Sequence, residues 1–351
     1  MQRENPVYHF CTYFDQGYLI HGLALYRSLV RHVESFVLYV LCLDEFTYKV
    51  FHHLNFPNLK PISVLDFERG DQALLEAKKN RSRIEYYFTC TPSLPLYIFD
   101  NFQDVDLVTY LDADLFCYGH PAPIFEELGN QSILIVEHRF PEHLRHMEKV
   151  GIYNVSLLSF RNDARARDCL KWWRERCLEW CYQRVEENRF ADQKYLNDLP
   201  QRFSGVVVQQ HKGSGLAPWN VCQYNIQDRN GRLLVDSDPL IFYHFNSFYV
   251  FNSFLYRTEL ETFGARLEGP LLSSVYVPYI RELQSIRREI RSRLGGGKFL
   301  RSNNWKDLVY SIINGRVLLL VLGPIATSID FSVLSHPVTY LRGSRSPRQS
   351  S

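Results

Sequence analysis

The sequence lacks the signatures of the commonest nucleotide-binding and zinc-binding proteins. It has no GxGxxG after its first apolar run and no GxxxxGKS or GxxxxGKT anywhere, which argues against a classical dinucleotide enzyme and a P-loop NTPase. No two of its eight cysteines have CxxC spacing, so a structural zinc site is not indicated. The cysteines lie mostly in apolar stretches, which predicts reduced and buried thiols.

Long apolar segments are missing as well. The N-terminal stretch MQRENPVYHF has no basic start followed by an apolar run, so it predicts no signal peptide and a cytoplasmic protein. The run VLLLVLGPIA at 317–326 is much shorter than the roughly 20 apolar residues that span a bilayer. We therefore expect no transmembrane helix.

A large net charge is also absent, because 40 Lys+Arg face 38 Asp+Glu over 351 residues. With 46% hydrophobic residues, such a chain can bury a full globular core. The balance hides an asymmetry: residues 281–351 hold twelve basic and four acidic residues, a surplus of eight positive charges. Since the whole chain carries +2, the rest carries −6. The two parts are expected to meet different partners.

Apolar runs that suit strands alternate with helical patterns through the first half of the chain. We expect strands at 7–13, 35–43 and 59–65, with helices at 18–32 and 45–54 between them. This rhythm predicts an α/β fold with a mainly parallel sheet, in which ligands bind at the carboxyl ends of the strands. Further elements are expected as strands at 107–111, 132–136, 153–160 and 240–245 and a helix at 164–187.

The strand predicted at 107–111 ends in Asp112-Ala113-Asp114, which places two carboxylates close together. Like charges at such a distance repel each other and lose hydration unless a cation lies between them. Mg²⁺ and Mn²⁺ bind carboxylate oxygens and keep positions open for substrate phosphates. The pair therefore indicates a metal that binds a diphosphate, while a solvated turn or a helix N-cap is the alternative for an isolated Asp-x-Asp.

Several further segments accompany TYLDADLF, in this order: HFCTYFDQGYLIHGLALYRSL from residue 9, GIYNVSLLSFR at 151–161, RFADQKYLND at 189–198, LAPWNV at 216–221 and FYHFNS at 242–247. In content and order they resemble the motifs of glycosyltransferase family 8, whose members are retaining, UDP-sugar-dependent enzymes. The resemblance covers about residues 7–250. It implies the GT-A fold, a Rossmann-like, mixed and mainly parallel sheet flanked by helices, here with a C-terminal helical extension.

Carried over position by position, the resemblance implies a metal site made of Asp112, Asp114 and His244. A neutral imidazole is a suitable ligand for Mn²⁺, although His244 taken alone is typical of a half-buried histidine. The resemblance also implies that Thr12 and Tyr13 hold the base and ribose of the donor. A plain strand end is the alternative for these two residues.

The resemblance places Asn154, Asp192 and Gln193 at the donor sugar. An amide and a carboxylate there can bind hydroxyl groups and stabilise positive charge at the anomeric carbon. Front-face attack assisted by the departing phosphate needs no enzyme nucleophile, so Asp192 is assigned to positioning and charge stabilisation, with helix capping as the alternative. Lys212, in HKGSGLAP, is expected either to clamp a phosphate or to lie in a surface turn.

The sequence departs from the family in the helix before the Asp-x-Asp strand. Family members often carry an arginine there that helps to hold the donor, whereas this chain has Thr89, and Arg81 or Arg83 is expected to substitute. The segment EHRFPEHLRHMEK at 137–149 contains three histidines without zinc-site spacing. We expect it to form a solvated loop that borders the acceptor.

The basic C-terminal part begins with a predicted amphipathic helix, whose apolar residues recur every three or four positions: Ile280, Leu283, Ile286, Ile290 and Leu294. Its arginines lie mostly on the other face. Segment 280–325 is expected either to contact an anionic membrane, on the inner face of the plasma membrane, or to pack on the catalytic domain with the arginines in water. We expect a catalytic domain at 1–260, a helical basic extension at 261–342 and a disordered tail at 343–351.

These features predict a metal-dependent glycosyltransferase that moves a hexose from a UDP-sugar to a saccharide or lipid-linked glycan, with retention and with Mn²⁺ or Mg²⁺. Cell-surface polysaccharide biosynthesis is the expected context, and nucleic acid is not an expected partner. One alternative is a sugar-nucleotide pyrophosphorylase or related nucleotidyltransferase, although CTYFDQGYL lacks the usual glycine-rich loop. The other is a catalytically silent nucleotide- or glycan-binding protein.

Overall fold

The structure is a computed structural model that describes residues 6–252, 254–294, 318–322 and 325–329. The chain divides into two compact units, made of Met1–Ser247 with Leu260–Arg301 and of Phe248–Glu259 with Ser302–Ser351. This division does not coincide with the boundary expected at residue 260, and the limits of the catalytic domain stay a prediction. The tail expected at 343–351 lies outside the described residues.

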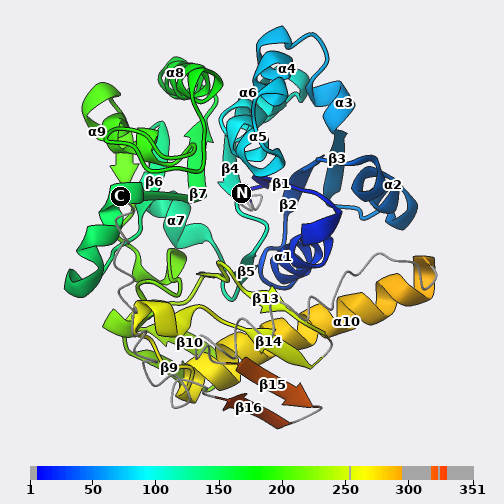
Figure 1. Ribbon diagram of the computed structural model, residues 1–351, viewed down its shortest axis with the longest axis vertical. Helices are drawn as coiled ribbons and strands as arrows, with labels where there is room; N and C mark the ends of the chain where they lie inside the picture. The colour runs from blue at the N-terminus through cyan, green and yellow to red at the C-terminus, as the bar shows by residue number, and fades with distance from the viewer. Residues whose placement is uncertain (1–5, 253, 295–317, 323–324, 330–351) are drawn as a thin grey trace, which may run out of the picture. The chain divides into compact units, whose positions relative to one another are not determined.

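A seven-stranded sheet forms the framework of the first unit (Figure 1). Its strands, in spatial order, are β3 (Leu59–Ser63), β2 (Phe36–Cys42), β1 (Tyr8–Phe14), β4 (Leu107–Leu111), β7 (Tyr153–Arg161), β6 (Ile133–Glu137) and β8 (Val206–Val208). Neighbouring strands are parallel, except that β7 runs antiparallel to both β4 and β6. The predicted mixed, mainly parallel sheet is confirmed.

Helices cover both faces of this sheet. The α-helices of the described chain are α1 (Leu19–His32), α2 (Glu45–Leu54), α3 (Val64–Phe67), α4 (Gln72–Lys79), α5 (Arg83–Cys90), α6 (Ser93–Asn101), α7 (Ala122–Leu128), α8 (Ala164–Glu179), α9 (Leu199–Arg202) and α10 (Val277–Leu294), of which α10 packs on α1 rather than on the sheet. Figure 1 shows α4, α5, α6 and α8 grouped on one side and α1 on the other. Helix α8 ends earlier than predicted, because Trp180 adopts an extended backbone with φ −154° and ψ 120°.

The main core lies between the sheet and helices α5, α6 and α8. Apolar residues of α8 at helical spacing, including Cys169, Trp173 and Cys177, face it and are fully buried. Burial of one large apolar side chain stabilises the fold by roughly 1.5–3 kcal/mol. The prediction of buried thiols holds for all cysteines except the exposed Cys222.

A short antiparallel pair connects two distant parts of the first unit. β5 (Leu115–Cys117) follows β4 almost directly and pairs with β12 (Phe242–His244), with His244 opposite Leu115. β12 is shorter than the strand predicted at 240–245. A separate antiparallel sheet precedes it, made of β9 (Ile226–Arg229), β10 (Arg232–Val235) and β11 (Asp238–Pro239). The β5–β12 pair carries residue 244 to the carboxyl end of β4.

Helix α10 packs against α1 within the first unit. Its apolar residues Ile280, Leu283 and Ile286 are fully buried. Ion pairs support the contact, with Glu282 2.6 Å from Arg31 and 3.2 Å from Arg27. The predicted helix is confirmed, and its apolar face is covered by protein. The arginines at 281, 288, 291 and 293 are exposed.

The described part of the second unit is an antiparallel sheet of β13 (Tyr249–Val250), β14 (Leu255–Arg257), β15 (Leu318–Leu322) and β16 (Ile325–Ile329). Segment 318–329 was expected to belong to a helical extension, and its described residues are strands instead. Five consecutive apolar residues at 318–322 match the length of a strand better than that of a helix. Among the helices that the structure describes, none is long and apolar enough to cross a membrane.

Candidate active site

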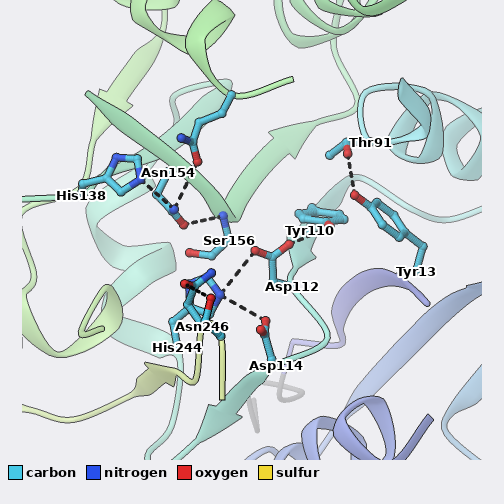
Figure 2. A network of polar contacts seen from close by, with 12 residues as sticks. Tyr13, Thr91, Tyr110, Asp112, Asp114, His138, Asn154, Ser156, His244 and Asn246 are labelled. Atoms are coloured by element: carbon cyan, nitrogen blue, oxygen red, sulfur yellow. Dashed lines mark hydrogen bonds and ion pairs between the residues drawn. The ribbon is translucent and has the colours of Figure 1, made fainter. Parts of the chain in front are cut away.

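Two carboxylates and an imidazole meet at the carboxyl end of β4. Asp112 follows β4 directly, Asp114 precedes β5, and His244 is the last residue of β12. Nε2 of His244 lies 3.1 Å from Oδ1 of Asp114 and 3.6 Å from Oδ2 of Asp112 (Figure 2). One potential ligand atom from each residue lies within 4.8 Å of the other two. The fold thus brings the three predicted metal ligands together.

Backbone hydrogen bonds hold the acidic turn in place. The N–H of Asp112 donates to the carbonyl of Ser156 on β7 at 2.9 Å, and the N–H of Phe245 donates to the carbonyl of Asp114 at 2.9 Å. The hydroxyl of Tyr110 donates to Oδ1 of Asp112 at 2.8 Å. The turn is therefore tied to strands on both sides, and one carboxylate is oriented by a neighbouring phenol.

The charges of this cluster compensate one another in part. Burial raises the pKa of Asp112 to about 6, although His244 opposes the shift. Burial also acts on Asp114, but the charge and hydrogen bond of His244 lower its pKa below the usual range. Burial alone would lower the pKa of His244, and the two carboxylates reverse this and raise it. The cluster thus favours a positive charge at its centre.

A divalent cation fits this donor set. Two carboxylate oxygens and one imidazole nitrogen are ligands that Mn²⁺ accepts, and Mg²⁺ is also bound through carboxylates. Nδ1 of His244 is buried and has no hydrogen-bond partner among the described residues, so Nε2 is the nitrogen engaged with the carboxylates. A cation bound there would replace the proton that otherwise bridges the imidazole and the carboxylates.

A cavity of about 300 Å³ borders the cluster. Aromatic side chains, including those of Phe140, Phe190, Trp219 and Phe263, form part of its wall. Its polar lining includes Tyr13, Asp112, His138, Asn154, Asp192, Gln193 and His244. Besides Asp112, five of the predicted site residues therefore line this cavity, whereas the predicted metal ligand Asp114 is not among its lining residues. Its size lies at the lower end of the usual range for small-molecule sites.

Two predicted donor-binding residues lie elsewhere. Thr12 is fully buried within β1, and no residue that the structure describes forms a hydrogen bond with its hydroxyl. Nζ of Lys212 lies 2.7 Å from Oδ2 of Asp236. Neither Thr12 nor Lys212 is among the residues that line the cavity. Their roles at the donor stay predictions, and the ion pair suits the surface-turn alternative for Lys212.

The residues expected to replace the missing family arginine are also engaged elsewhere. Arg81 stacks on the ring of Tyr182, 4.0 Å from its centre, and Arg83 lies 3.6 Å from Asp15. Thr89 is buried and donates its hydroxyl to the carbonyl of Glu85 one turn earlier in α5. Neither arginine lines the cavity.

Asp192 is held in a constrained position. The preceding Ala191 has a left-handed φ of 46°, a conformation that costs non-glycine residues free energy and is common at active sites. The indole N–H of Trp173 donates to the carbonyl of Asp192 at 2.8 Å. Burial raises the pKa of this carboxyl to about 7, and the charge of Asp112 adds to the shift. Within the described part of the chain its Oδ2 has no hydrogen-bond partner, so one oxygen remains for a ligand.

His138 is a site residue that the sequence interpretation missed. It was expected in a solvated loop, but its side chain is 4% exposed and lines the cavity, so that expectation is wrong for His138. His143 and His146 are indeed exposed. The position of His138 in the sequence could have identified it as a site residue, because it directly follows the strand β6 just as Asp112 directly follows β4. Trp219 was also missed as a wall residue, although its segment was recognised.

The fold is that of the GT-A glycosyltransferases. The solved galactosyltransferase LgtC, in complex with donor and acceptor sugar analogues, has a similar fold, with a TM-score of 0.50 and 16% sequence identity over 81% of this chain and 99% of LgtC. The family model of glycosyl transferase family 8 matches residues 9–166.

Two relatives from Bacillus subtilis (strain 168) extend the match beyond that segment. Uncharacterized protein YfnF is 33% identical over 277 residues, which are 76% of this chain and 89% of YfnF. Uncharacterized protein YfnD is 30% identical over 294 residues, which are 81% of this chain and 91% of YfnD. The chain belongs to glycosyl transferase family 8, and it is a glycosyltransferase rather than a pyrophosphorylase or a silent binding protein.

The carboxyl of Asp192 should make the stability of the metal-free protein depend on pH. Folding raises its pKa from about 4 to about 7, so its stabilising contribution is complete below pH 4 and is lost as the pH rises through 7. Asp192→Asn removes this titration. We expect the variant's gain in free energy of unfolding over wild type to be about 2–3 kcal/mol larger at pH 8 than at pH 5, measured by urea denaturation. If Asp192→Asn raised the free energy of unfolding equally at pH 5 and pH 8, the raised pKa assigned to Asp192 would be contradicted.

Proposed function

We propose that this enzyme transfers a hexose from a UDP-sugar to a saccharide or lipid-linked glycan, with a divalent metal and with retention of anomeric configuration. The observation that carries the proposal is the cluster of Asp112, Asp114 and His244 beside a cavity that also exposes Asn154, Asp192 and Gln193. Cell-surface polysaccharide synthesis is the proposed context, because the acceptor is proposed to be a glycan.

Charge balance supports the metal dependence. A nucleoside diphosphate brings several negative charges, and no arginine or lysine is among the described residues that line the cavity. Asp112 and Asp192 add further negative charge. A cation held by Asp112, Asp114 and His244 would neutralise the diphosphate as it departs. We therefore propose that donor binding, and not only turnover, requires Mn²⁺ or Mg²⁺.

The polar residues beyond the metal cluster are proposed to act on the sugar. Asn154 and Gln193 bind its hydroxyl groups, which orients the anomeric carbon toward the acceptor. The carboxyl of Asp192 lies near the charge that develops on the anomeric carbon and ring oxygen, and it stabilises that charge when ionised. Because the acceptor attacks on the face of the departing diphosphate, its proton passes to a diphosphate oxygen and no covalent glycosyl-enzyme forms.

Tyr13 is proposed to hold the nucleotide end of the donor. It lines the cavity, and its hydroxyl is 3.0 Å from the hydroxyl of Thr91. Its ring lies at a tilt to that of Tyr110, which orients Asp112. A phenol fixed in this way can position a base beside the metal cluster. Thr12, one residue earlier and fully buried, is proposed to contribute through its backbone rather than its side chain.

A donor panel tests the proposed reaction. UDP-glucose, UDP-galactose, UDP-N-acetylglucosamine, GDP-mannose and GDP-glucose are each incubated with the enzyme and Mn²⁺, and release of nucleoside diphosphate is measured. We expect slow hydrolysis of a UDP-sugar even without an acceptor. The anomeric configuration of the sugar transferred to a glycan is then read by NMR, and retention is expected. Preference for a GDP-sugar, or an inverted product, would contradict the proposal.

Asp114→Asn tests the metal site directly. The change keeps the size of the side chain and removes one negative charge, so transfer should fall by about 10²-fold or more. Mn²⁺ with UDP should raise the melting temperature of wild type by mass action and leave that of the variant nearly unchanged. His244→Ala should weaken the metal response similarly. Asp106→Asn, an exposed carboxylate at the other end of β4, is the matched control and should behave like wild type.

We also propose that the enzyme is cytoplasmic and that the exposed face of α10 makes peripheral contact with an anionic membrane. Because the apolar face of α10 is buried, this contact would be electrostatic rather than inserted. The motivating feature is the row of exposed arginines at 281, 288 and 291.

Replacement of these three arginines by alanine should reduce co-sedimentation with vesicles that contain phosphatidylglycerol, and should leave donor hydrolysis unchanged. Wild-type binding should fall as salt is raised from 50 to 300 mM, because ions screen the attraction. Equal binding of the triple variant and wild type at low salt would refute the contact.

A further inference from the structure

His138 has a single hydrogen-bonding arrangement that satisfies its neighbours. Its Nδ1 lies 3.1 Å from the carbonyl oxygen of Ile152, and its Nε2 lies 3.1 Å from Nδ2 of Asn154. A carbonyl can only accept a hydrogen bond and a carboxamide nitrogen can only donate. The ring proton must therefore lie on Nδ1, and Nε2 must act as an acceptor.

The imidazole is also held rigidly. The indole N–H of Trp219 and Nδ2 of Asn220 each donate to the backbone carbonyl of His138 at 2.9 Å. The ring stacks on Phe140, with 4.7 Å between ring centres and 10° between the planes. Burial lowers the pKa of His138 to about 4, which keeps the ring neutral at physiological pH.

The carboxamide of Asn154 is fixed from both ends. Its Oδ1 accepts the backbone N–H of Ser156 at 2.8 Å, and its Nδ2 donates to His138 at 3.1 Å and to Oε1 of Gln193 at 3.3 Å. Figure 2 shows Asn154 between His138 and Ser156. Both hydrogens of Nδ2 are thus used, and one lone pair on Oδ1 remains.

The same chain of bonds reaches Gln193. With Oε1 bound to Asn154, Nε2 of Gln193 donates to the carbonyl of Val150 at 3.1 Å. One N–H of Gln193 remains for a ligand. The two amides both belong to residues that line the cavity, and they retain opposite chemistry, an acceptor on Asn154 and a donor on Gln193.

We infer that His138 is a positioning residue that fixes the carboxamide of Asn154 as a hydrogen-bond acceptor toward a hydroxyl group of the donor sugar, and through it sets the donor N–H of Gln193. This inference rests on the proposed function for the identity of the ligand. The arrangement of the three side chains is a property of the protein alone. Loss of the acceptor at Nε2 would leave one hydrogen of Nδ2 without its partner and would weaken the hold on the amide of Asn154, which the N–H of Ser156 and Oε1 of Gln193 would then orient alone.

One experiment needs no donor. In protein labelled with ¹⁵N-histidine at pH 7.5, long-range ¹H–¹⁵N spectra should show His138 as the neutral ring with its proton on Nδ1, identified by the signals that vanish in His138→Gln. In Asn154→Asp, a carboxylate replaces the donor that faces Nε2, so a proton should appear on Nε2. A wild-type ring with its proton on Nε2, or on both nitrogens, would overturn the inference.

The second experiment is a double-mutant cycle on hydrolysis of UDP-glucose or UDP-galactose with Mn²⁺. His138→Leu should lower kcat/KM about tenfold in the wild-type background and less than about twofold in Asn154→Ala, because His138 acts through Asn154. His138→Gln, which can place an acceptor near the position of Nε2, should restore activity to within about threefold. His146→Leu, an exposed histidine of the same segment, is the matched control and should match wild type.

Additive losses in the cycle would overturn the positioning role, because they would mean that His138 acts independently of Asn154. Absence of hydrolysis by wild type with every UDP-sugar tested would count against the proposed function. The ring-proton measurement would then still decide whether His138 fixes Asn154. The two failures are therefore distinguishable.

Discussion

The site depends on the antiparallel pairing of β5 with β12. This pair places His244 beside the turn of Asp112 and Asp114, although 130 residues separate it from Asp114 in the chain. Two carboxylates this close together, one of them only partly buried, would repel each other and lose hydration without a positive neighbour. The imidazole compensates for this in the free protein, and a divalent cation can do so in the enzyme. The need of the two carboxylates for a positive neighbour therefore has two consequences. It makes His244 stabilise the turn, and it creates a site where a cation can bind the diphosphate leaving group.

Hydrogen bonds between neutral groups fix the orientation of other side chains in the site. Asn154 and Gln193 have amides that could point either way, and each rotation would exchange a donor for an acceptor. Backbone N–H and carbonyl groups at Ser156, Val150 and Ile152 remove this freedom, with His138 as the connection between them. Because these polar groups are already held by hydrogen bonds in a buried network, they need little reorientation during a reaction. Such prior orientation of polar groups is what electrostatic preorganisation requires.

Sequence reasoning succeeded where a feature is local. The strand that ends in Asp112, the helical spacing of Ile280 to Ile290 and the alternation of strands and helices are visible in short windows, and all were predicted. It failed for His138, because burial of a histidine after a strand depends on the loop at 216–221 that covers it. It also placed 318–329 in a helical extension, whereas the described residues there form the strands β15 and β16, which pair with each other, and β15 also pairs with the distant strand β14.

The sequence by itself determined the α/β class, the family and the residue types available for metal binding, because these follow from periodicity and from short motifs. Only the tertiary structure decided which of those residues share a cavity. It separated Asn154, Asp192 and Gln193, which line the cavity, from Lys212, whose ammonium group is paired with Asp236. It also fixed the ring proton of His138. The physical reason is that charge pairing, burial and hydrogen-bond direction depend on neighbours in space, which residue order does not specify.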